Sequence, residues 1–298
     1  MDFTSLINFL DAEQIKYKTN VKIALFVSIR VGGIASFIVY PNTIEQLCTL
    51  IKYLHGKYKY FILANGTNTY FCDYYEGVIV LTKNINNVYL SQNKIIAECG
   101  ASLTGCAVYA YENSLSGMEF AYGIPGTVGG GIYMNASAYN GKISDIVQSC
   151  LVYDIIKNST YLLENKEIKF SDKYSIFTNK ELVILNAKLN LNFDIKNSIK
   201  EKMNTYMQKR LLTQPLDVPS AGSAFKRPKG NYASKLIDDA GLKGCCFGDA
   251  QISYKHAGFI VNNGHATSDD INKLICLVKS EVKNKFNVIL EEEIIYVE

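Results

Sequence analysis

The sequence lacks the residues and patterns of several common classes of protein. It has no tryptophan and three histidines, and its eight cysteines include no C-x-x-C pair. Histidines this few, scattered and without ligand-like spacing to cysteine do not indicate a zinc site, so we expect no bound metal. Cys245 and Cys246 are adjacent in sequence and therefore badly placed for an unstrained disulfide. We expect the thiols to be reduced.

Signals for export and membrane insertion are also missing. No stretch approaches the ~18 consecutive apolar residues that a membrane-spanning helix needs, because polar or charged residues interrupt every run. The first residues, MDFTSLINFLDAEQ, lack the basic segment and the small-residue cleavage site of a signal peptide. We therefore expect a cytoplasmic protein with no membrane partner.

The charge is too small to indicate a nucleic-acid partner. The formal net charge is +3 over 298 residues, whereas nucleic-acid-binding domains carry a basic stripe and a pI above about 9. A mild basic excess suits small anionic ligands better. With 48% hydrophobic and 20% charged residues, the chain is typical of a globular protein, and its length predicts two or three packed domains.

The common nucleotide-binding and hydrolase motifs do not occur. No G-x-G-x-x-G follows a strand, and neither G-x-x-x-x-G-K nor G-x-S-x-G is present, which argues against a Rossmann site, a P-loop and a nucleophile elbow. Two other glycine-bearing loops remain, ANGTN at 64–68 and GIPGTVGGG at 123–131. Each can present backbone amides to a pyrophosphate. Because glycine turns are common, the residues alone leave a purely structural role open.

Sheet and helix alternate in the first third of the chain. Thr43 begins a predicted helix, since its side chain can cap the helix and Gln46, three residues on, completes a capping box. Apolar segments at 60–65, 77–81 and 93–101 are typical of strands. This is an α+β pattern.

Glycine and proline mark two special regions further on. Seven of the 21 glycines lie in 115–141, so the backbone there needs conformations or close approaches that a Cβ would prevent. Three of the five prolines fall between 215 and 228, which predicts a domain boundary just before Pro215.

The last third predicts a small α+β domain. Residues 231–241 read as a helix that ends at Gly241, and 252–264 as a strand and turn. Residues 267–286 form an amphipathic helix in which Thr267 and Asp270 supply the N-terminal cap. Its predicted buried stripe is Ile271, Leu274, Ile275, Val278 and Val282. The chain closes with a predicted strand at 288–297.

Long runs of the sequence resemble one enzyme family, the UDP-N-acetylenolpyruvoylglucosamine reductases. The runs occur in order over nearly the whole chain: SIRVGG, LANGTN, SGMEFAYGIPGTVGGGIYMNASAYNG, QPLDVPSAGSAFKRP, SYKHAGFIVN and KFNVILEEEI. The GIPGTVGG block with the following MN and AY is highly specific. The short chain resembles the form of the family that lacks an extra substrate-covering loop.

The resemblance implies a fold and a reaction. The fold would be an α+β FAD-binding domain of the vanillyl-alcohol-oxidase type at about 1–205, with subdomains at about 1–80 and 81–205, followed by a substrate-binding domain at 206–298. In this family NADPH reduces FAD, and hydride then passes to the vinyl carbon of a UDP-linked enolpyruvyl amino sugar. A proton must reach the carbon beside the carboxylate. We expect FAD and NADPH as cofactors, a small-molecule substrate, and a monomer.

The resemblance also implies where the cofactor binds. The candidate residues lie in the first three matching runs, and we take them as Arg30, Asn65, Gly66, Thr67, Asn68, Gly123, Ile124, Gly126, Thr127, Gly129, Gly130, Asn135 and Ala136. Among these, Arg30 is expected either beside the flavin or in a structural role.

Two residues match the family's catalytic positions. Ser223, in AGSAF, matches its proton-donating serine, and Glu293, the third acid of LEEEI, matches its catalytic glutamate. An alcohol is a poor acid, so Ser223 can act only if it is held close and its developing alkoxide is stabilised. Glu293 lies between apolar residues, and partial desolvation would favour its protonated form. The alternatives are a turn serine and a solvated strand glutamate.

The substrate's diphosphate and carboxylate need cations or amide donors. Lys226 and Arg227 follow Ser223 closely, and Lys255 and His256 lie in the SYKHAGF run, so these four are the predicted anion contacts. Each can alternatively be an ordinary solvated charge.

One position departs from the family pattern. Where the family typically has Tyr-Arg-x-Ser, with a catalytic arginine, this chain has Asp172-Lys173-Tyr174-Ser175. Lys173 keeps the positive charge but not the planar fork that can hold a carboxylate in a bidentate contact. Either lysine suffices, Tyr174 compensates, or the enzyme is slower.

Three functions remain to be separated. The first is the reductase, with Ser223, Glu293 and Lys173 as catalytic residues. The second is a flavin-binding relative with weak or lost activity, suggested by Asp172-Lys173. The third is another oxidoreductase of the same flavoprotein superfamily, which is disfavoured because His55 lies on a predicted helix outside any flavin-contacting motif.

Overall fold

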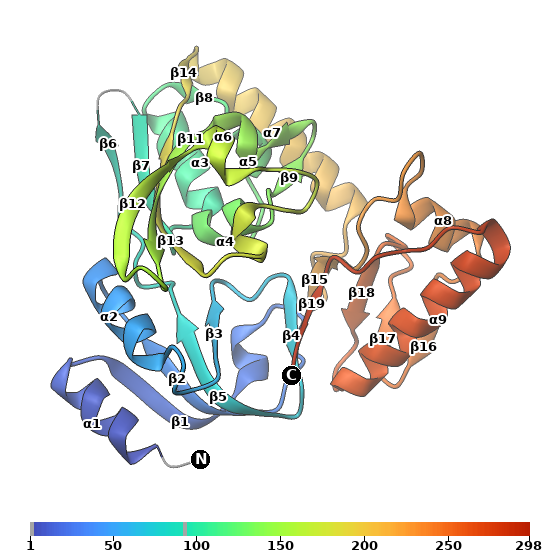
Figure 1. The fold of residues 1–298 in the computed structure, drawn as a ribbon. Coiled ribbons are helices and arrows are strands. Elements are labelled where there is room, and N and C mark those ends of the chain that lie inside the picture. Colours follow the sequence, from blue (N-terminus) through green and yellow to red (C-terminus); the bar gives the residue numbers. More distant parts are fainter. Residues whose placement is uncertain (1–2, 92–93) are drawn as a thin grey trace. The chain divides into compact units, whose positions relative to one another are not determined.

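The computed structural model describes residues 3–91 and 94–298 (Figure 1). The chain forms two compact units, each of three segments. The segments of the first unit are Met1–Thr19, Phe37–Asn65 and Gly77–Lys209, and those of the second are Asn20–Ser36, Gly66–Glu76 and Arg210–Glu298. Among the described residues no helix combines the length and apolarity of a membrane span.

A four-stranded sheet has the order β1-β2-β5-β3, formed by β1 (Lys16–Lys22), β2 (Ile34–Tyr40), β5 (Tyr74–Leu81) and β3 (Tyr60–Leu63). Strands β3 and β5 pair in parallel. In the first unit, α1 (Thr4–Ala12) and α2 (Ile44–Leu54) bury their apolar stripes. Thr43 caps α2 as predicted, but Gln46 accepts a hydrogen bond from the amide of Asn42 rather than from that of Thr43.

The larger sheet of the first unit is antiparallel. Its order is β12 (Ser159–Glu164), β11 (Val147–Asp154), β13 (Leu182–Leu189), β7 (Lys94–Glu98) and β6 (Val88–Ser91). The predicted strand at 93–101 is β7, and Asn93 lies outside the described residues. Ile95 and Ala97 of β7 are fully buried and alternate with less buried residues, which is the period-2 pattern of a strand with one buried face.

The other elements of the first unit are short, apart from the 18-residue helix α7. They are α3 (Leu103–Glu112), β8 (Leu115–Ser116), η2 (Glu119–Ala121), α4 (Val128–Tyr133), β9 (Ser137–Ala138), β10 (Gly141–Lys142), α5 (Ile143–Ile146), α6 (Asn165–Ile168), η3 (Ile176–Thr178), β14 (Asn192–Phe193) and most of α7 (Lys196–Thr213). The glycine-rich block therefore contributes short helices and hairpin strands rather than long regular elements.

The second unit contains an antiparallel sheet covered by a helix. The strand order is β15 (Ser220–Ser223), β18 (Phe259–Asn262), β17 (Ala250–Ile252) and β16 (Cys246–Phe247). Helix α9 (Ser268–Phe286) packs on β16 and β17, and α8 (Ala233–Asp239) packs on α9 (Figure 1). The predicted stripe of α9 is buried, and Thr267 and Asp270 form the predicted capping box. The first segments of this unit contribute η1 (Ile23–Phe26) and β4 (Thr69–Phe71).

The predicted continuous strand at 288–297 is wrong. Regular pairing is confined to β19 (Ile295–Val297), which runs parallel to β4. The residues before β19 are hydrogen-bonded to a different segment, since Lys226 donates to the carbonyl of Glu291 and Glu293 donates to that of Ala224. The segment changes its partner at Glu293, and this change interrupts the strand.

Candidate active site

The second unit brings the two predicted catalytic residues to neighbouring positions. Ser223 ends β15, where it lies opposite Phe259 of β18. Gly222, just before it, has φ +77°, a conformation that disfavours any residue with a Cβ. The next residue, Ala224, accepts the amide hydrogen of Glu293 at 2.8 Å. Ser223 and Glu293 are both half-buried. Backbone hydrogen bonds at Ala224 and Lys226 thus join the segments that carry these two residues, which are 70 positions apart in sequence.

The carbonyl group of Glu293 has a second anchor. The side-chain amide of Asn68 donates to it at 2.9 Å, and the carbonyl of Asn68 accepts the amide hydrogen of Ile295 at 2.9 Å. Asn68 thereby contacts the C-terminal segment on both sides of Ile294. The sequence predicted this asparagine only as a cofactor contact, and no local pattern could indicate a partner 225 residues away.

The other two acids of LEEEI have lysine partners. Glu291 pairs with Lys226 at 3.3 Å, where both side chains are exposed, and Glu292 pairs with Lys279 at 2.7 Å. Desolvation raises the pKa of Glu292, but the hydrogen bond from Lys279, a backbone hydrogen bond and the charges of Lys279 and Lys226 together outweigh it, so that the pKa is lowered. The lowered pKa keeps the carboxylate of Glu292 ionised at neutral pH. An exposed pair such as Lys226–Glu291 stabilises little, so Lys226 can exchange that partner for a ligand.

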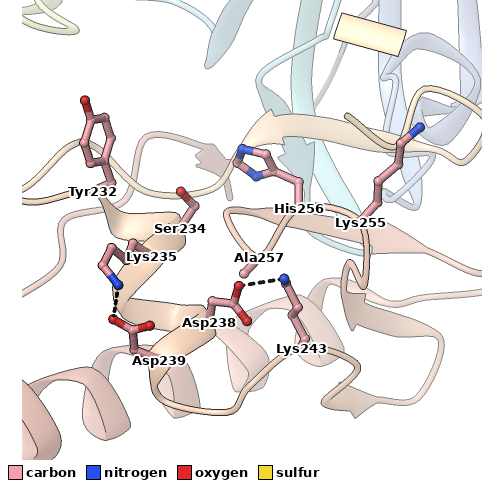
Figure 2. Close-up of a pocket in the computed structure, with 9 residues that line it drawn as sticks. All are labelled: Tyr232, Ser234, Lys235, Asp238, Asp239, Lys243, Lys255, His256 and Ala257. Carbon is pink, nitrogen blue, oxygen red and sulfur yellow. Dashed lines mark hydrogen bonds and ion pairs between the residues drawn. The ribbon is translucent and has the colours of Figure 1, made fainter. Parts of the chain in front are cut away.

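A pocket of about 350 Å³ lies in the same unit, beside α8 (Figure 2). It includes two predicted residues, Lys255 and His256, and its complete lining is Tyr232, Ser234, Lys235, Asp238, Asp239, Lys243, Lys255, His256 and Ala257. Sequence reasoning missed Tyr232, which lies in the predicted helix at 231–241, and Lys243, which follows it closely. Arg227 is close to this pocket, since its guanidinium lies 3.9 Å from the ring centre of Tyr232.

The cations of this pocket already have partners. Lys235 pairs with Asp239 at 2.7 Å and Lys243 with Asp238 at 2.6 Å, and Figure 2 shows both pairs beside α8. The amine of Lys255 is directed away from them in Figure 2, because it donates to the carbonyl of Leu211 at 2.7 Å. An anion that enters the pocket must compete with these acceptors.

His256 is a neutral residue in this structure. Its Nδ1 accepts a hydrogen bond from the amide of Gly258 at 3.2 Å, and its ring packs edge-on against Phe259. Burial lowers the pKa of His256, the hydrogen bond opposes this, and the nearby Lys243 lowers it further. The remaining N–H is on Nε2. His256 can therefore donate a hydrogen bond to an anion but does not contribute a positive charge at neutral pH.

Replacing His256 by asparagine should weaken the loss of stability in mild acid. Because its pKa is lowered by folding, His256 contributes stability that is complete above its unfolded pKa of 6.5 and is lost as the pH falls through the folded value. Asparagine keeps an acceptor for Gly258 without titrating. Thermal unfolding at pH 7.5, 6.5 and 5.5 should show a smaller decrease in Tm for His256→Asn than for the wild type, and equal decreases would contradict this assignment.

In the first unit, the two glycine loops meet. The side-chain amide of Asn65, which follows β3, donates to the carbonyl of Pro125. Ala64 lies 3.6 Å from the position that a Cβ on Gly130 would occupy. The sequence separates these loops by about 60 residues, but the fold makes them neighbours.

Hydrogen bonds identify which amides of the loops remain available. Val128 and Gly129 donate to Ala101 and Cys99, and Gly123, Ile124 and Gly130 also have protein acceptors. Ala136 donates to Gly131. In the described part of the chain, the backbone amides of Asn65, Gly126 and Thr127 in the first unit have no protein acceptor, and within the second unit the same holds for residues 66–68. These amides are suited to an anion such as a pyrophosphate.

Two glycines of the loops also have structural roles. Gly66 has φ +60°, and a Cβ there would lie 2.2 Å from the carbonyl of Phe26 within the second unit. A Cβ on Gly129 would approach the carbonyl of Cys99 to 3.0 Å. The structural interpretation that the sequence left open therefore applies to both, and it is compatible with amides that bind a ligand. The Thr127 hydroxyl caps α4 by accepting from Gly130.

Asn135 holds the turn that contains Lys173. The buried Asn135 donates to the carbonyl of Ser171 at 2.9 Å and accepts from the amide of Ser144 at 3.0 Å. The fully buried Ser175 donates to the carbonyl of Tyr133 at 2.8 Å. Between these anchors, Lys173 has φ +52°, which is uncommon for a residue with a long side chain. Unusual backbone conformations of this kind occur often at functional sites.

Arg30 lies in a tethered segment of the second unit. The buried side chain of Asn262 donates to the carbonyl of Ile29 at 3.0 Å, and the hydroxyl of Ser28 donates to that of Ser220. Arg30 itself is exposed and has φ +57°. The two residues before Arg30 are therefore anchored by hydrogen bonds, while the side chain of Arg30 extends into solvent.

Among residues 3–91 and 94–298, no three His, Cys, Asp or Glu side chains are grouped so that they could hold a metal ion. All eight cysteines are free thiols, and burial raises the pKa of Cys99, Cys106 and Cys150 to about 12, so these three are unreactive.

Comparison with known proteins assigns both parts of the chain. Residues 35–159 match the FAD binding domain family, and residues 214–297 match the family described as UDP-N-acetylenolpyruvoylglucosamine reductase, C-terminal domain. Within the first unit, the free amides of Asn65, Gly126 and Thr127 suit the pyrophosphate of a dinucleotide. The predicted α+β fold, with a flavin-binding domain followed by a second domain, is confirmed.

Curated relatives and a crystal structure agree with these matches. The chain is 46% identical to UDP-N-acetylenolpyruvoylglucosamine reductase from Caldanaerobacter subterraneus, over 90% of this chain and 89% of that one. It is 44% identical to the enzyme from Clostridium novyi, over 96% and 93%. The crystal structure of the Thermus caldophilus reductase aligns with a TM-score of 0.81 at 27% identity, over 95% of this chain and 99% of that one. The chain belongs to the UDP-N-acetylenolpyruvoylglucosamine reductase family of FAD-dependent oxidoreductases.

Proposed function

We propose that this chain uses NADPH to reduce UDP-N-acetylenolpyruvoylglucosamine to UDP-N-acetylmuramate, a precursor of peptidoglycan and hence of cell shape and division. The observation that best supports the proposal is the hydrogen bond from Glu293 to Ala224, since it joins the segment of the predicted glutamate to that of the predicted serine. The same pairing leaves both residues half-buried rather than fully solvated.

The proposed cofactor contacts in the first unit are the backbone amides of Asn65, Gly126 and Thr127, and the amides of residues 66–68 are proposed contacts within the second unit. Their lack of protein acceptors supports contact with the pyrophosphate of FAD. FAD, when bound, carries the hydride that NADPH supplies and the substrate accepts. Asn65, whose side chain donates to Pro125 of the other loop, is proposed to hold the two loops together, and the remaining predicted residues, Arg30 and Asn135 among them, are proposed as further cofactor contacts.

Ser223 is the proposed proton donor to the carbon beside the substrate carboxylate. Its hydroxyl needs a neighbour that stabilises the developing alkoxide, because an alcohol is a weak acid. Glu293 is proposed to orient and polarise the same end of the substrate. Lys173 is proposed to stabilise the negative charge that grows on the substrate as hydride arrives.

The pocket beside α8 is the proposed site for the substrate's phosphates. Lys243, Lys235 and Tyr232 line it, and Arg227 lies against Tyr232. Lys226, Lys255 and the Nε2–H of His256 are further proposed donors. Phosphate oxygens would replace the carboxylates of Asp238 and Asp239 as partners of the two lysines.

Lys243→Ala should raise the KM for the substrate about tenfold with little change in kcat. A charge-assisted hydrogen bond contributes about 1.5–3 kcal/mol, and here the exchange with Asp238 reduces the net gain. Lys273→Ala is the matched control, because it removes another exposed lysine–aspartate pair outside the pocket. Steady-state kinetics would test this, and an unchanged KM for Lys243→Ala would argue against a phosphate site.

One assay tests the activity as a whole. NADPH oxidation is followed with and without the enolpyruvyl substrate, in air and without oxygen. The reductase should oxidise NADPH rapidly only with the substrate and independently of oxygen. Oxidation that requires oxygen and ignores the substrate would instead indicate another oxidoreductase.

A flavin-binding relative with weak activity is the second candidate function. It is favoured by Asp172 and Lys173, which stand where the family typically has tyrosine and arginine, and by the uncommon φ of Lys173. In that case the protein would bind FAD and become reduced by NADPH, but the substrate would reoxidise it slowly.

The setting of the enzyme also follows from this proposal. NADPH and UDP-sugars are cytoplasmic metabolites, so we place the reaction there. We further propose a monomer with no nucleic-acid or membrane partner, and a functional division near residue 205 between flavin-binding and substrate-binding parts. Light scattering at several protein concentrations should give a mass near 33.3 kDa.

A further inference from the structure

The C-terminal segment has different hydrogen-bonding partners before and after Glu293. Before it, residues 291 and 293 exchange backbone hydrogen bonds with Lys226 and Ala224. After it, Ile295–Val297 pairs with Thr69–Phe71 in parallel. Glu293 is thus the residue at which the chain passes from one partner to the other. At such a junction, the regular hydrogen bonds of a β-ladder no longer fix the backbone conformation.

Asn68 is the side chain that spans this junction. Its Nδ2 donates to the carbonyl of Glu293 at 2.9 Å, while its own carbonyl accepts from Ile295 at 2.9 Å. Both backbone polar groups of Glu293 are therefore hydrogen-bonded. Its N–H donates to Ala224, and its C=O accepts from Asn68. Asn68 is half-buried, which protects the bond from water.

We propose that Asn68 is a positioning residue that fixes the backbone of Glu293 for proton and substrate chemistry, and that its side chain does not serve primarily as a flavin ligand. The proposal rests on the catalytic role proposed above for Glu293. The backbone amide of Asn68 remains in the group suited to the cofactor, so the residue links the glycine loop to the C-terminal segment.

The side chain is suited to this task by its donor group. Aspartate has the same shape but would present an oxygen to the carbonyl oxygen of Glu293, which is repulsive. Alanine would leave that carbonyl without this donor. A displacement of about 1 Å at a reacting group can cost about 100-fold in rate. We expect Asn68→Ala and Asn68→Asp to lower the rate of flavin reoxidation by the substrate about 10- to 100-fold.

The control is Tyr70→Phe. Tyr70 lies on the adjacent strand β4 and donates to Asn272 of α9 at 2.6 Å, so this variant also removes one side-chain hydrogen bond of the same segment but none to Glu293. Both Asn68 variants should bind FAD, be reduced by NADPH at rates within about twofold of the wild type, and bind substrate within about threefold. Tyr70→Phe should lower the Tm as much as they do and leave both half-reactions within about twofold.

A double-mutant cycle identifies the route of the effect. If Asn68 acts through Glu293, Asn68→Ala should slow reoxidation little further once Glu293→Gln is present. Weakened FAD binding by the Asn68 variants, additive losses in the cycle, or an unchanged reoxidation rate would each overturn the proposal. If Glu293→Gln alone leaves reoxidation unchanged, the catalytic role of Glu293 fails, and the role of Asn68 falls with it. If Glu293→Gln slows reoxidation but the Asn68 variants do not, only the positioning role of Asn68 is rejected.

Discussion

Replacing Ser223 by alanine should slow reoxidation of the reduced flavin by the substrate about 10²- to 10⁴-fold, the range over which a general acid contributes to rate. Flavin reduction by NADPH should change less than about twofold, since no proton from Ser223 is needed in that step. The hydroxyl is half-buried at the end of β15, so its removal leaves only a small cavity. Stopped-flow absorbance of the flavin separates the two half-reactions.

Ser220→Ala is the matched control for this experiment. Ser220 lies on the same strand, and its contact with Ser28 uses its backbone carbonyl, which alanine retains. Both half-reactions of Ser220→Ala should resemble those of the wild type. If Ser223→Ala impaired both half-reactions equally, the serine would act on flavin binding or folding rather than as the proton donor.

Local patterns predicted the helices that carry their own signals. Thr267, Asp270 and the apolar stripe from Ile271 to Val282 define α9 without reference to the rest of the chain, and the structure confirms them. The cap at Thr43 is confirmed for the same reason. In both cases the hydrogen bonds and the apolar spacing lie within a few residues, which is the range that sequence periodicity reports.

Long-range pairing could not be predicted in this way. The run at 288–297 has the composition of one strand, but its backbone bonds go first to Ala224 and Lys226 and then to β4. Strand propensity describes a residue's fit to a pleated surface and does not identify the partner. The contact between Asn68 and Glu293 was missed for the same reason.

Charge composition was an equally incomplete guide to the ligand site. Lys255 and His256 lie in the pocket as lining residues, but Lys255 donates to Leu211 and His256 is neutral because its environment lowers its pKa. Whether a lysine is available depends on acceptors such as the carbonyl of Leu211, which only the fold brings within 2.7 Å of Lys255. The sequence indicated the family and the ligand class, and the structure was needed to identify the competing acceptors.

Replacing Lys173 by alanine should lower the limiting rate of flavin reoxidation about 10²- to 10³-fold while changing substrate binding much less. Charge that stabilises the transition state more than the bound substrate affects the rate rather than the affinity, and loss of one such group typically costs this much. Because Lys173 has φ +52°, Lys173→Gly should be made beside Lys173→Ala. Glycine tolerates this conformation, so equal losses in both variants would assign the effect to the charge.

Lys169 supplies the matched control, since it is also a lysine at φ +52° in the same unit and ends α6. Lys169→Gly and Lys169→Ala should leave both half-reactions unchanged. Lys173→Arg, alone and with Asp172→Tyr, then tests whether the planar fork typical of the family raises the rate. The double variant matters because Asp172 can hold an arginine in an ion pair. If every Lys173 variant matches the wild type, this lysine is an ordinary solvated charge and the typical arginine's role is not needed in this enzyme.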